Sequence, residues 1–372
     1  MPFWLLLVAM FASPWFTYGV FTVPSMRHLE HLRRVRQNLQ IRSEIMRLTR
    51  TFFWLQSFVE VDAPTILQLP GQEPYLSPMR IAVRDDKNVE RTGYLHTSPE
   101  YTMKKLLAAG EQRIFSMQKV FRDNESFGGT HNPEFMMIEW YRAGADYWAI
   151  MDDTESLFVS VANALLDGPH ADAVRPAIEQ SRILRQPWAR LHMRDVWRQY
   201  ANVDLEQYLT REAMYVLCRE KGYAAAETES YADLFYRVFL NEIEPNIGTA
   251  ESGPVFLYGY PAEMAALARL APNDPRYAQR FELYVSGMEL ANAFGELTDH
   301  HEQLRRLELE REERRLAGKD VFAVDREFID ALRAGMPESS GIALGIDRMV
   351  QVMTGCQNIN DVIALPMSIL FD

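Results

Sequence analysis

Hydrophobic and polar residues alternate most regularly between residues 134 and 142, and this period of two predicts a β-strand with unlike faces. One face would carry an aromatic ring, a carboxylate and a phenol, from Phe135, Met137, Glu139 and Tyr141. The opposite face would carry Met136, Ile138, Trp140 and Arg142. A polar, glycine-bearing turn at residues 124–132 precedes the strand, and Arg122 ends the strand before that turn. The pattern predicts a hairpin with an arginine beside its carboxylate face.

Two later segments also have the pattern of strands. In residues 288–296, Glu289, Ala291 and Ala293 are expected to face one side, with Leu290, Asn292 and Phe294 on the other. Gly295 permits a bulge that would redirect Glu296. Small, apolar residues at 341–345 predict a strand that runs into a helix beginning near Asp347.

Helical periodicity fills most of the remaining chain. Residues 42–64 read as an amphipathic helix followed by a strand that ends in proline, and residues 167–251 read mostly as helices. No internal repeat or low-complexity linker separates these segments. We therefore expect an α+β fold in which helices flank a mixed, mostly antiparallel sheet.

The side chains in these segments suggest a nucleotide and an amine as ligands. A guanidinium forks onto a phosphate, an aromatic ring stacks on a purine, and a carboxylate beside a tyrosine hydroxyl can hold an ammonium group. Carboxylates in an apolar strand are costly to bury unless they meet a cation, which Mg²⁺ or a substrate ammonium would supply.

These segments resemble the conserved motifs of the class II aminoacyl-tRNA synthetase catalytic core, and among its members the lysine-specific branch. Residues 97–101, TSPEY, are similar to a substrate loop of that branch, residues 42–64 to its motif 1, and residues 121–142 and 341–350 to its motifs 2 and 3. The resemblance implies ATP and Mg²⁺ as cofactors and a homodimer that pairs through motif 1.

The resemblance also assigns roles to residues. Arg122 and Arg348 would be the catalytic cations on the phosphates. The remaining ATP-binding residues would be Glu125, His131, Asn132, Phe135, Glu289, Leu290 and Gly345. Related sequences place the adenine-binding glutamate one residue closer to the arginine, so Asn124 is the alternative to Glu125.

The amino acid and the metal would occupy the neighbouring side chains. The resemblance implies that the substrate contacts Ser98, Pro99, Glu100, Glu139, Tyr141, Asn292, Glu296 and Ala343. It implies Glu289, with Glu296, as ligands of Mg²⁺. Because a carboxylate is already ionised near neutral pH, the expected adenylation needs alignment and charge neutralisation but no protein nucleophile or general base.

The acceptor of the activated acyl group is inferred from the domain organisation. About 40 residues precede motif 1, too few for the anticodon-binding barrel of a lysyl-tRNA synthetase. That organisation resembles the elongation factor P β-lysine ligase family, in which lysine or β-lysine is joined to a lysine side chain of elongation factor P. Ala343, where lysyl-tRNA synthetases usually have glycine, also favours this branch. A truncated synthetase that charges tRNA and a noncatalytic regulatory paralogue remain the alternatives, and the sequence leaves α-lysine and β-lysine open.

Composition adds weaker constraints. With 372 residues and 48% hydrophobic side chains, the chain can bury a large core, which we assign to one catalytic domain at residues 27–372. A net charge of −12 argues against broad nucleic-acid binding, so tRNA is not the expected partner. Two cysteines without CxxC spacing fit a reducing cytoplasm.

Residues 1–26 carry no charged side chain and include a hydrophobic run at residues 3–11. This extension is compatible with a membrane anchor or, less well, a secretion signal that lacks a basic start. We favour a third interpretation, in which translation begins at Met26.

Overall fold

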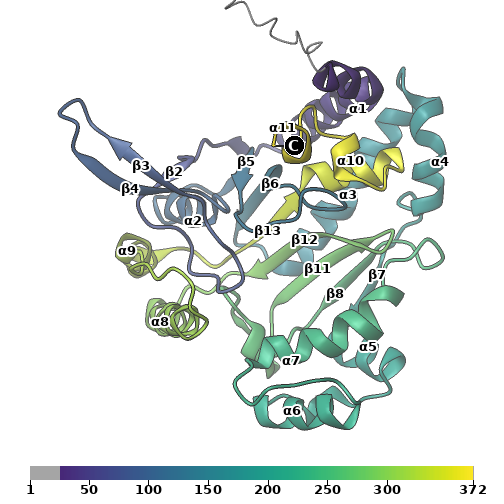
Figure 1. Cartoon of the computed structure of the whole chain (residues 1–372). Helices are drawn as coiled ribbons and strands as arrows, with labels where there is room; N and C mark the ends of the chain where they lie inside the picture. Colours follow the sequence, from purple (N-terminus) through teal and green to yellow (C-terminus); the bar gives the residue numbers. More distant parts are fainter. Residues whose placement is uncertain (1–25, 372) are drawn as a thin grey trace, which may run out of the picture.

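An eight-stranded mixed sheet organises the chain in a computed structural model that describes residues 26–371, so all but Met26 of the hydrophobic N-terminal extension lies outside the described part (Figure 1). Its strands, in spatial order, are β1 (Val59–Glu60), β5 (Arg113–Phe121), β6 (Glu134–Ala143), β13 (Ser339–Gly345), β12 (Met288–Gly295), β11 (Arg280–Val285), β8 (Val255–Tyr258) and β7 (Ala189–His192). Only the outermost pairs, β1 with β5 and β7 with β8, are parallel. The predicted mixed, mostly antiparallel sheet is therefore confirmed.

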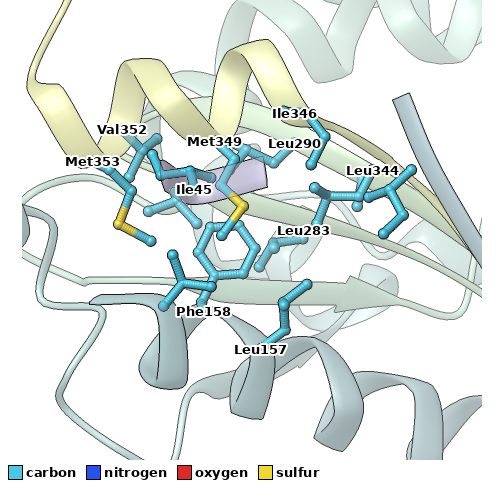
Figure 2. Packing of buried hydrophobic residues seen from close by; sticks show 14 of the residues in the cluster. Ile45, Leu157, Phe158, Leu283, Leu290, Leu344, Ile346, Met349, Val352 and Met353 are labelled. Carbon is cyan, nitrogen blue, oxygen red and sulfur yellow. The ribbon is translucent and has the colours of Figure 1, made fainter. Parts of the chain in front are cut away.

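One face of the sheet packs on helices and forms the main core. These helices are α1 (Arg27–Leu55), α3 (Tyr147–Leu166), α4 (Ala171–Ser181) and α10 (Ile346–Thr354). In α1, Ile41, Ile45, Thr49 and Phe53 recur every four residues and make a buried stripe. Figure 2 shows Met349 and Val352 of α10 packed with Ile45 and with Phe158 of α3. The sheet's opposite face is left free for a cavity.

Two further groups of helices border that opposite face. One consists of α2 (Glu100–Ala108), α8 (His300–Leu316) and α9 (Arg326–Gly335), which share a buried cluster. The other consists of α5 (Met193–Tyr200), α6 (Arg211–Glu220) and α7 (Tyr231–Val238), near the β7 and β8 edge (Figure 1). A separate three-stranded sheet of β2 (Ile66–Leu67), β3 (Arg80–Arg84) and β4 (Glu90–Leu95) projects beside α2 (Figure 1).

Short elements complete the chain. They are β9 (Leu270–Ala271), β10 (Asp274–Ala278), α11 (Met367–Leu370), a π-turn at Phe239–Ile243 and single turns at Leu205–Gln207, Glu244–Asn246, Ala262–Met264 and Ile359–Asp361. Within residues 26–371, no helix combines the length and the apolar character needed to span a membrane.

Candidate active site

A cavity of about 970 Å³ opens on the free face of the sheet. Its floor includes Phe135, Met137 and Tyr141 of β6, while Ile138 and Trp140 of the same strand lie in the core behind it. This is the division that the alternating pattern predicted, and it holds because β6 pairs without interruption with β5 and β13.

Arg122 and Phe135 lie together at one end of the cavity. The guanidinium carbon of Arg122 is 5.1 Å from the centre of the Phe135 ring. The Arg122 Nε is enclosed and has no hydrogen-bond partner among residues 26–371. Burial lowers the pKa of Arg122, and the nearby carboxylates of Glu125 and Glu289 oppose that change. An enclosed cation with a free donor next to an aromatic ring can bind a nucleotide phosphate and its base.

Arg348, in the first turn of α10, adds a second cation. Its Nη1 donates to the carbonyl of Glu289 at 2.6 Å, its Nε donates to the carbonyl of Thr130 at 3.2 Å, and its Nη2 lies 3.1 Å from His131 Nε2. A guanidinium has only donors, so His131 Nε2 accepts and carries no proton. Burial and then Arg348 lower the pKa of His131, which agrees with a neutral ring.

The turn before β6 holds the remaining nucleotide candidates. Glu125 lines the cavity, whereas Asn124 is exposed and does not, so the geometry favours Glu125 for the adenine role. Asn132 also borders the cavity, but its amide is engaged: Nδ2 donates to the carbonyl of Glu134 and Oδ1 accepts from the Met367 amide. That side chain fastens α11 to the turn.

The predicted faces of β12 hold for residues 291–294 but are wrong for Glu289 and Leu290, because the strand contains an extra residue there. Ala291 pairs with Leu283 and Glu289 pairs with Tyr284, so Leu290 has no partner on β11. The bulge therefore falls at Leu290 and not at Gly295. As a result, Glu289 shares the cavity face with Asn292, Phe294 and Glu296, while Ala291 and Ala293 belong to the core.

The proposed metal ligands Glu289 and Glu296 lie in different environments. Glu296 is fully buried and forms an ion pair with Lys104. Glu289 forms no ion pair with any residue between 26 and 371, and burial and repulsion from Glu282 raise its pKa to about 7. Because Mg²⁺ is commonly held by one or two carboxylates together with substrate phosphates, Glu289 fits this role and Glu296 does not. No cluster of three or more potential ligands occurs within the described chain.

Glu282, which sequence reasoning missed, supports this end of the cavity. Its carboxylate accepts hydrogen bonds from Arg280 at 2.7 Å, Tyr284 at 2.9 Å and Tyr260. A carboxylate bound by three donors is held in place beside Glu289. The signal in the sequence was the FELY segment of β11, in which Glu282 interrupts apolar residues.

Ser98, Glu139 and Tyr141 form a hydrogen-bonded group at the other end of the cavity. The Ser98 hydroxyl donates to Glu139 Oε1 at 2.5 Å, and the Tyr141 hydroxyl donates to Glu139 Oε2 at 2.9 Å. Glu139 is only 1% exposed and lies beneath the cavity surface, so the two hydroxyls and not the carboxylate face the cavity. Burial and then repulsion from Glu100 raise the pKa of Glu139 to about 8.

Lys104 is the second residue that sequence reasoning missed. It is fully buried in α2, and its Nζ lies 2.6 Å from Glu100 Oε1 and 2.6 Å from Glu296 Oε2. Burial would lower the pKa of Lys104, but the two carboxylates outweigh it and raise the pKa. One internal cation thus holds together the two carboxylates that were expected to bind the substrate's amines. The spacing of Glu100 and Lys104, four residues apart in a helix, was a signal for half of this arrangement.

The central strand β13 completes the floor. A Cβ at Gly341 would lie 2.2 Å from the Tyr141 ring, so glycine is required there. Ala343 lines the cavity and pairs with Glu139 on one side and Asn292 on the other. Gly345 caps α10 and lies near Arg348. Pro99 does not line the cavity and precedes the first turn of α2.

Asp347 joins the segments that resemble motifs 1, 2 and 3 at the edge of the cavity. Its Oδ1 accepts from Arg42 Nη2 at 2.7 Å and Nε at 3.0 Å, and its Oδ2 accepts from the Met136 amide at 2.7 Å. The Asp347 side chain is 2% exposed. This network connects α1, β6 and α10, and so fixes the helix turn that carries Arg348.

The fold and cavity are those of a class II synthetase catalytic core. The chain belongs to the family of class II tRNA synthetases (D, K and N), whose model matches residues 23–369. This match confirms the predicted family and fold class.

Three individual relatives are similar to this chain over most of its length. The chain is 35% identical over 329 residues to the elongation factor P (R)-β-lysine ligase of Haemophilus influenzae strain PittGG, covering 88% of this chain and 94% of that protein. It is 34% identical over 341 residues to the ligase of the same name from Haemophilus influenzae strain Rd, covering 91% and 98%. It is also 34% identical over 325 residues to the lysine–tRNA ligase of Staphylococcus aureus strain MRSA252, covering 87% of this chain but 63% of that protein.

Proposed function

We propose that this protein is an ATP-dependent ligase that adenylates lysine or β-lysine and transfers it to a lysine side chain of elongation factor P. The observation that carries the proposal is the extent of similarity: 94% and 98% of the two elongation factor P ligases is covered, but only 63% of the lysine–tRNA ligase. The charge distribution of the cavity supports the first half of the reaction.

In the proposed adenylation, Arg122 and Arg348 bind the phosphates, and Phe135 stacks on the adenine. Glu289 would hold Mg²⁺, which when bound neutralises charge on the phosphates. The amino acid's carboxylate attacks the α-phosphorus and pyrophosphate leaves. Two guanidinium groups already fixed in an enclosed site stabilise the developing charge without having to reorganise.

The amino acid would lie toward Glu100, Tyr141 and Glu296. Glu100 receives the amine near the reacting carboxyl group, and Glu296, together with the Tyr141 hydroxyl, receives the distal ammonium. Lys104 forms ion pairs with both carboxylates and partly neutralises them. The two ammonium groups of the substrate would therefore bind to carboxylates that are connected through Lys104 and not to two separate anions. Asn292 and Ala343 border the chain between the two amines.

A two-stage assay tests the proposal. Purified protein should catalyse lysine-dependent or β-lysine-dependent pyrophosphate exchange, and labelled amino acid should then appear on elongation factor P and not on tRNA. Exchange with neither amino acid, in a folded preparation, would favour a noncatalytic paralogue. Label on tRNA would favour the truncated synthetase, a function to which the 34% identity with lysine–tRNA ligase also points.

We further propose that two copies pair through α1 and that the enzyme acts in the cytoplasm. The two cysteines, Cys218 and Cys356, are both free, which is compatible with a reducing compartment. Sedimentation of the purified chain would test the pairing.

A further inference from the structure

Arg280 lines the cavity, although no step of the proposed reaction uses it. Because side chains alternate along β11, Arg280 and Glu282 face the cavity while Phe281 and Leu283 belong to the main core. The Arg280 side chain is 11% exposed. A cation enclosed to that extent is costly unless its donors are bound, so the partners of Arg280 indicate what it does.

All three nitrogens of the Arg280 guanidinium lie against groups that line the cavity. Nη2 donates to Glu282 Oε1 at 2.7 Å and to the Tyr236 hydroxyl of α7 at 3.5 Å. Nη1 donates to the carbonyl of Met264 at 2.9 Å, and Nε donates to Asn292 Oδ1 at 3.2 Å. Arg280 therefore holds the side chain of Asn292 to a frame made by β11, α7 and the turn that contains Met264.

The contact with Arg280 decides which end of the Asn292 amide faces the cavity. An amide has an oxygen that accepts and a nitrogen that donates, whereas a guanidinium only donates. The atom next to Arg280 Nε must therefore be the oxygen. The Asn292 side chain lines the cavity, and its Nδ2 has no hydrogen-bond partner within residues 26–371. Asn292 thus offers the substrate its two N–H donors.

A donor restricts the part of the substrate that Asn292 can bind. Both ammonium groups of lysine or β-lysine only donate, whereas the carboxylate only accepts. Asn292 also lies toward the phosphate end of β12. Across the bulge it follows Glu289 on the same face, whereas Glu296 lies four positions further on, about 13 Å along an extended strand. The carboxylate, which must reach the α-phosphorus, meets both conditions.

We propose that Arg280 is a positioning residue that orients the amide of Asn292 so that Nδ2 binds the carboxylate of the amino acid. This assignment rests on the proposed function and adds to it a residue that acts through another side chain. A neutral amide suits the task, because it aligns the attacking carboxylate without removing the negative charge that makes this group a nucleophile.

The first test replaces Asn292 by aspartate, which keeps the size of the side chain and changes the group that faces the cavity. One carboxylate oxygen can still accept from Arg280, and the other takes the place of Nδ2. A carboxylate there repels the carboxylate of the substrate and attracts its ammonium groups. We expect N292D to raise the KM for the amino acid in pyrophosphate exchange about ten- to a hundred-fold, the value of a charged hydrogen bond.

The matched control ligand is 1,5-diaminopentane, which is lysine without its carboxylate. Its inhibition constant against exchange should be the same in N292D as in the wild type, or lower. A lower KM for the amino acid in N292D would show that the amide oxygen faces the substrate, and the assignment would be overturned. It would also be overturned if only the KM for ATP increased, or if the diamine weakened as much as the amino acid.

The second test asks whether Arg280 acts through Asn292. In R280K, lysine keeps a positive charge for Glu282 but has one nitrogen in place of three. We expect R280K and N292A each to raise the KM for the amino acid about tenfold, and the double variant R280K/N292A to raise it no further, because residues that act as one unit are not additive. The KM for ATP should stay close to that of the wild type.

The control for the exchange of arginine by lysine is R276K. The Arg276 side chain is 48% exposed and pairs with Asp274 and Glu206 outside the cavity. Its KM for the amino acid should equal that of the wild type.

Thermal unfolding checks that R280K is folded, and N292D, in which Arg280 is intact, decides the direction of the amide in either case. Effects on KM that multiply in the double variant would show that Arg280 acts independently of Asn292, and so would overturn the assignment. A wild type that exchanges pyrophosphate with neither amino acid refutes the proposed function. An active wild type with multiplying effects refutes the role of Arg280 alone.

Discussion

Replacement of Lys104 by methionine tests how the charges beneath the cavity are held. Lys104 is fully buried, with Glu100 and Glu296 each 2.6 Å from its Nζ. Methionine keeps most of the side chain's volume and removes only the charge. Breaking a buried ion pair from one side costs about 3–5 kcal/mol because the remaining charge has no partner. We expect K104M to lose stability on that scale.

The stability that K104M loses relative to the wild type should increase with pH. This direction follows from the pKa of Glu296. Burial raises the pKa of Glu296 to about 7 while Lys104 opposes the rise, so without Lys104 this pKa is higher still. A raised folded-state pKa gives stability at low pH that is lost as pH rises through that pKa. The wild type completes this loss near pH 7, whereas K104M continues to lose up to about 1.4 kcal/mol per pH unit until its own, higher Glu296 pKa is passed. Between pH 6.5 and pH 8.5 the gap should therefore widen, by at most about 2 kcal/mol.

Urea unfolding followed by tryptophan fluorescence measures both quantities. The control is K105M, because the neighbouring Lys105 is 35% exposed and pairs at 2.6 Å with Asp325, which is 14% exposed. Such a pair contributes about 1 kcal/mol or less. If K104M is as stable as K105M at pH 8.5, or if the gap between them is the same at both pH values, Lys104 does not neutralise this cluster.

Four other outcomes can be measured directly. R122A should reduce lysine-dependent pyrophosphate exchange at least about 100-fold with little change in Tm, because it removes a phosphate-binding donor that makes no ion pair with any residue between 26 and 371; wild-type exchange would contradict this. A343G should raise kcat/KM for α-lysine relative to β-lysine about tenfold, since one methyl group in a tight pocket is worth about 1–3 kcal/mol, and an unchanged ratio would disprove the pocket argument. D347N should destabilise the protein by about 2–3 kcal/mol in urea unfolding because it removes the charge partner of Arg42, whose side chain is 16% exposed, and a loss below 1 kcal/mol would refute the motif connection. Ligand-free protein should lose stability as pH rises from about 4.5 through 7, because Glu289 has a raised pKa, and saturating ATP with Mg²⁺ should reduce that loss in thermal unfolding; a pH-independent effect of the ligand would count against Glu289 as the metal ligand.

The alternation of hydrophobic and polar residues was sufficient to predict the two faces of a strand where that strand is regular. The faces of β6 followed from its alternation because both neighbouring strands pair with it along its length. The helix that carries Arg348 was predicted to begin near Asp347, and it begins at Ile346. Both features depend on residues adjacent in the chain.

Long-range partners could not be read from the same patterns. Lys104 looks like any helical lysine until β12 brings Glu296 to it, and Asp347 looks like a first-turn carboxylate until α1 brings Arg42. In each case burial makes the interaction strong, and burial is a property of the whole fold. The residues missed by sequence reasoning, Glu282 and Lys104, therefore hold the expected contacts in place through partners distant in the chain.

The bulge in β12 determines which of its glutamates face the cavity. Glu289 and Glu296 are seven residues apart, and an odd spacing in a regular strand would place them on opposite faces. The extra residue at Leu290 restores both to the cavity, one beside the two arginines and the other beside Lys104. Along an extended strand this spacing corresponds to about 20 Å. A single strand thus sets the separation between the phosphate end and the ammonium end, so a substrate must carry its distal amine at a fixed reach from the carboxyl group that is activated.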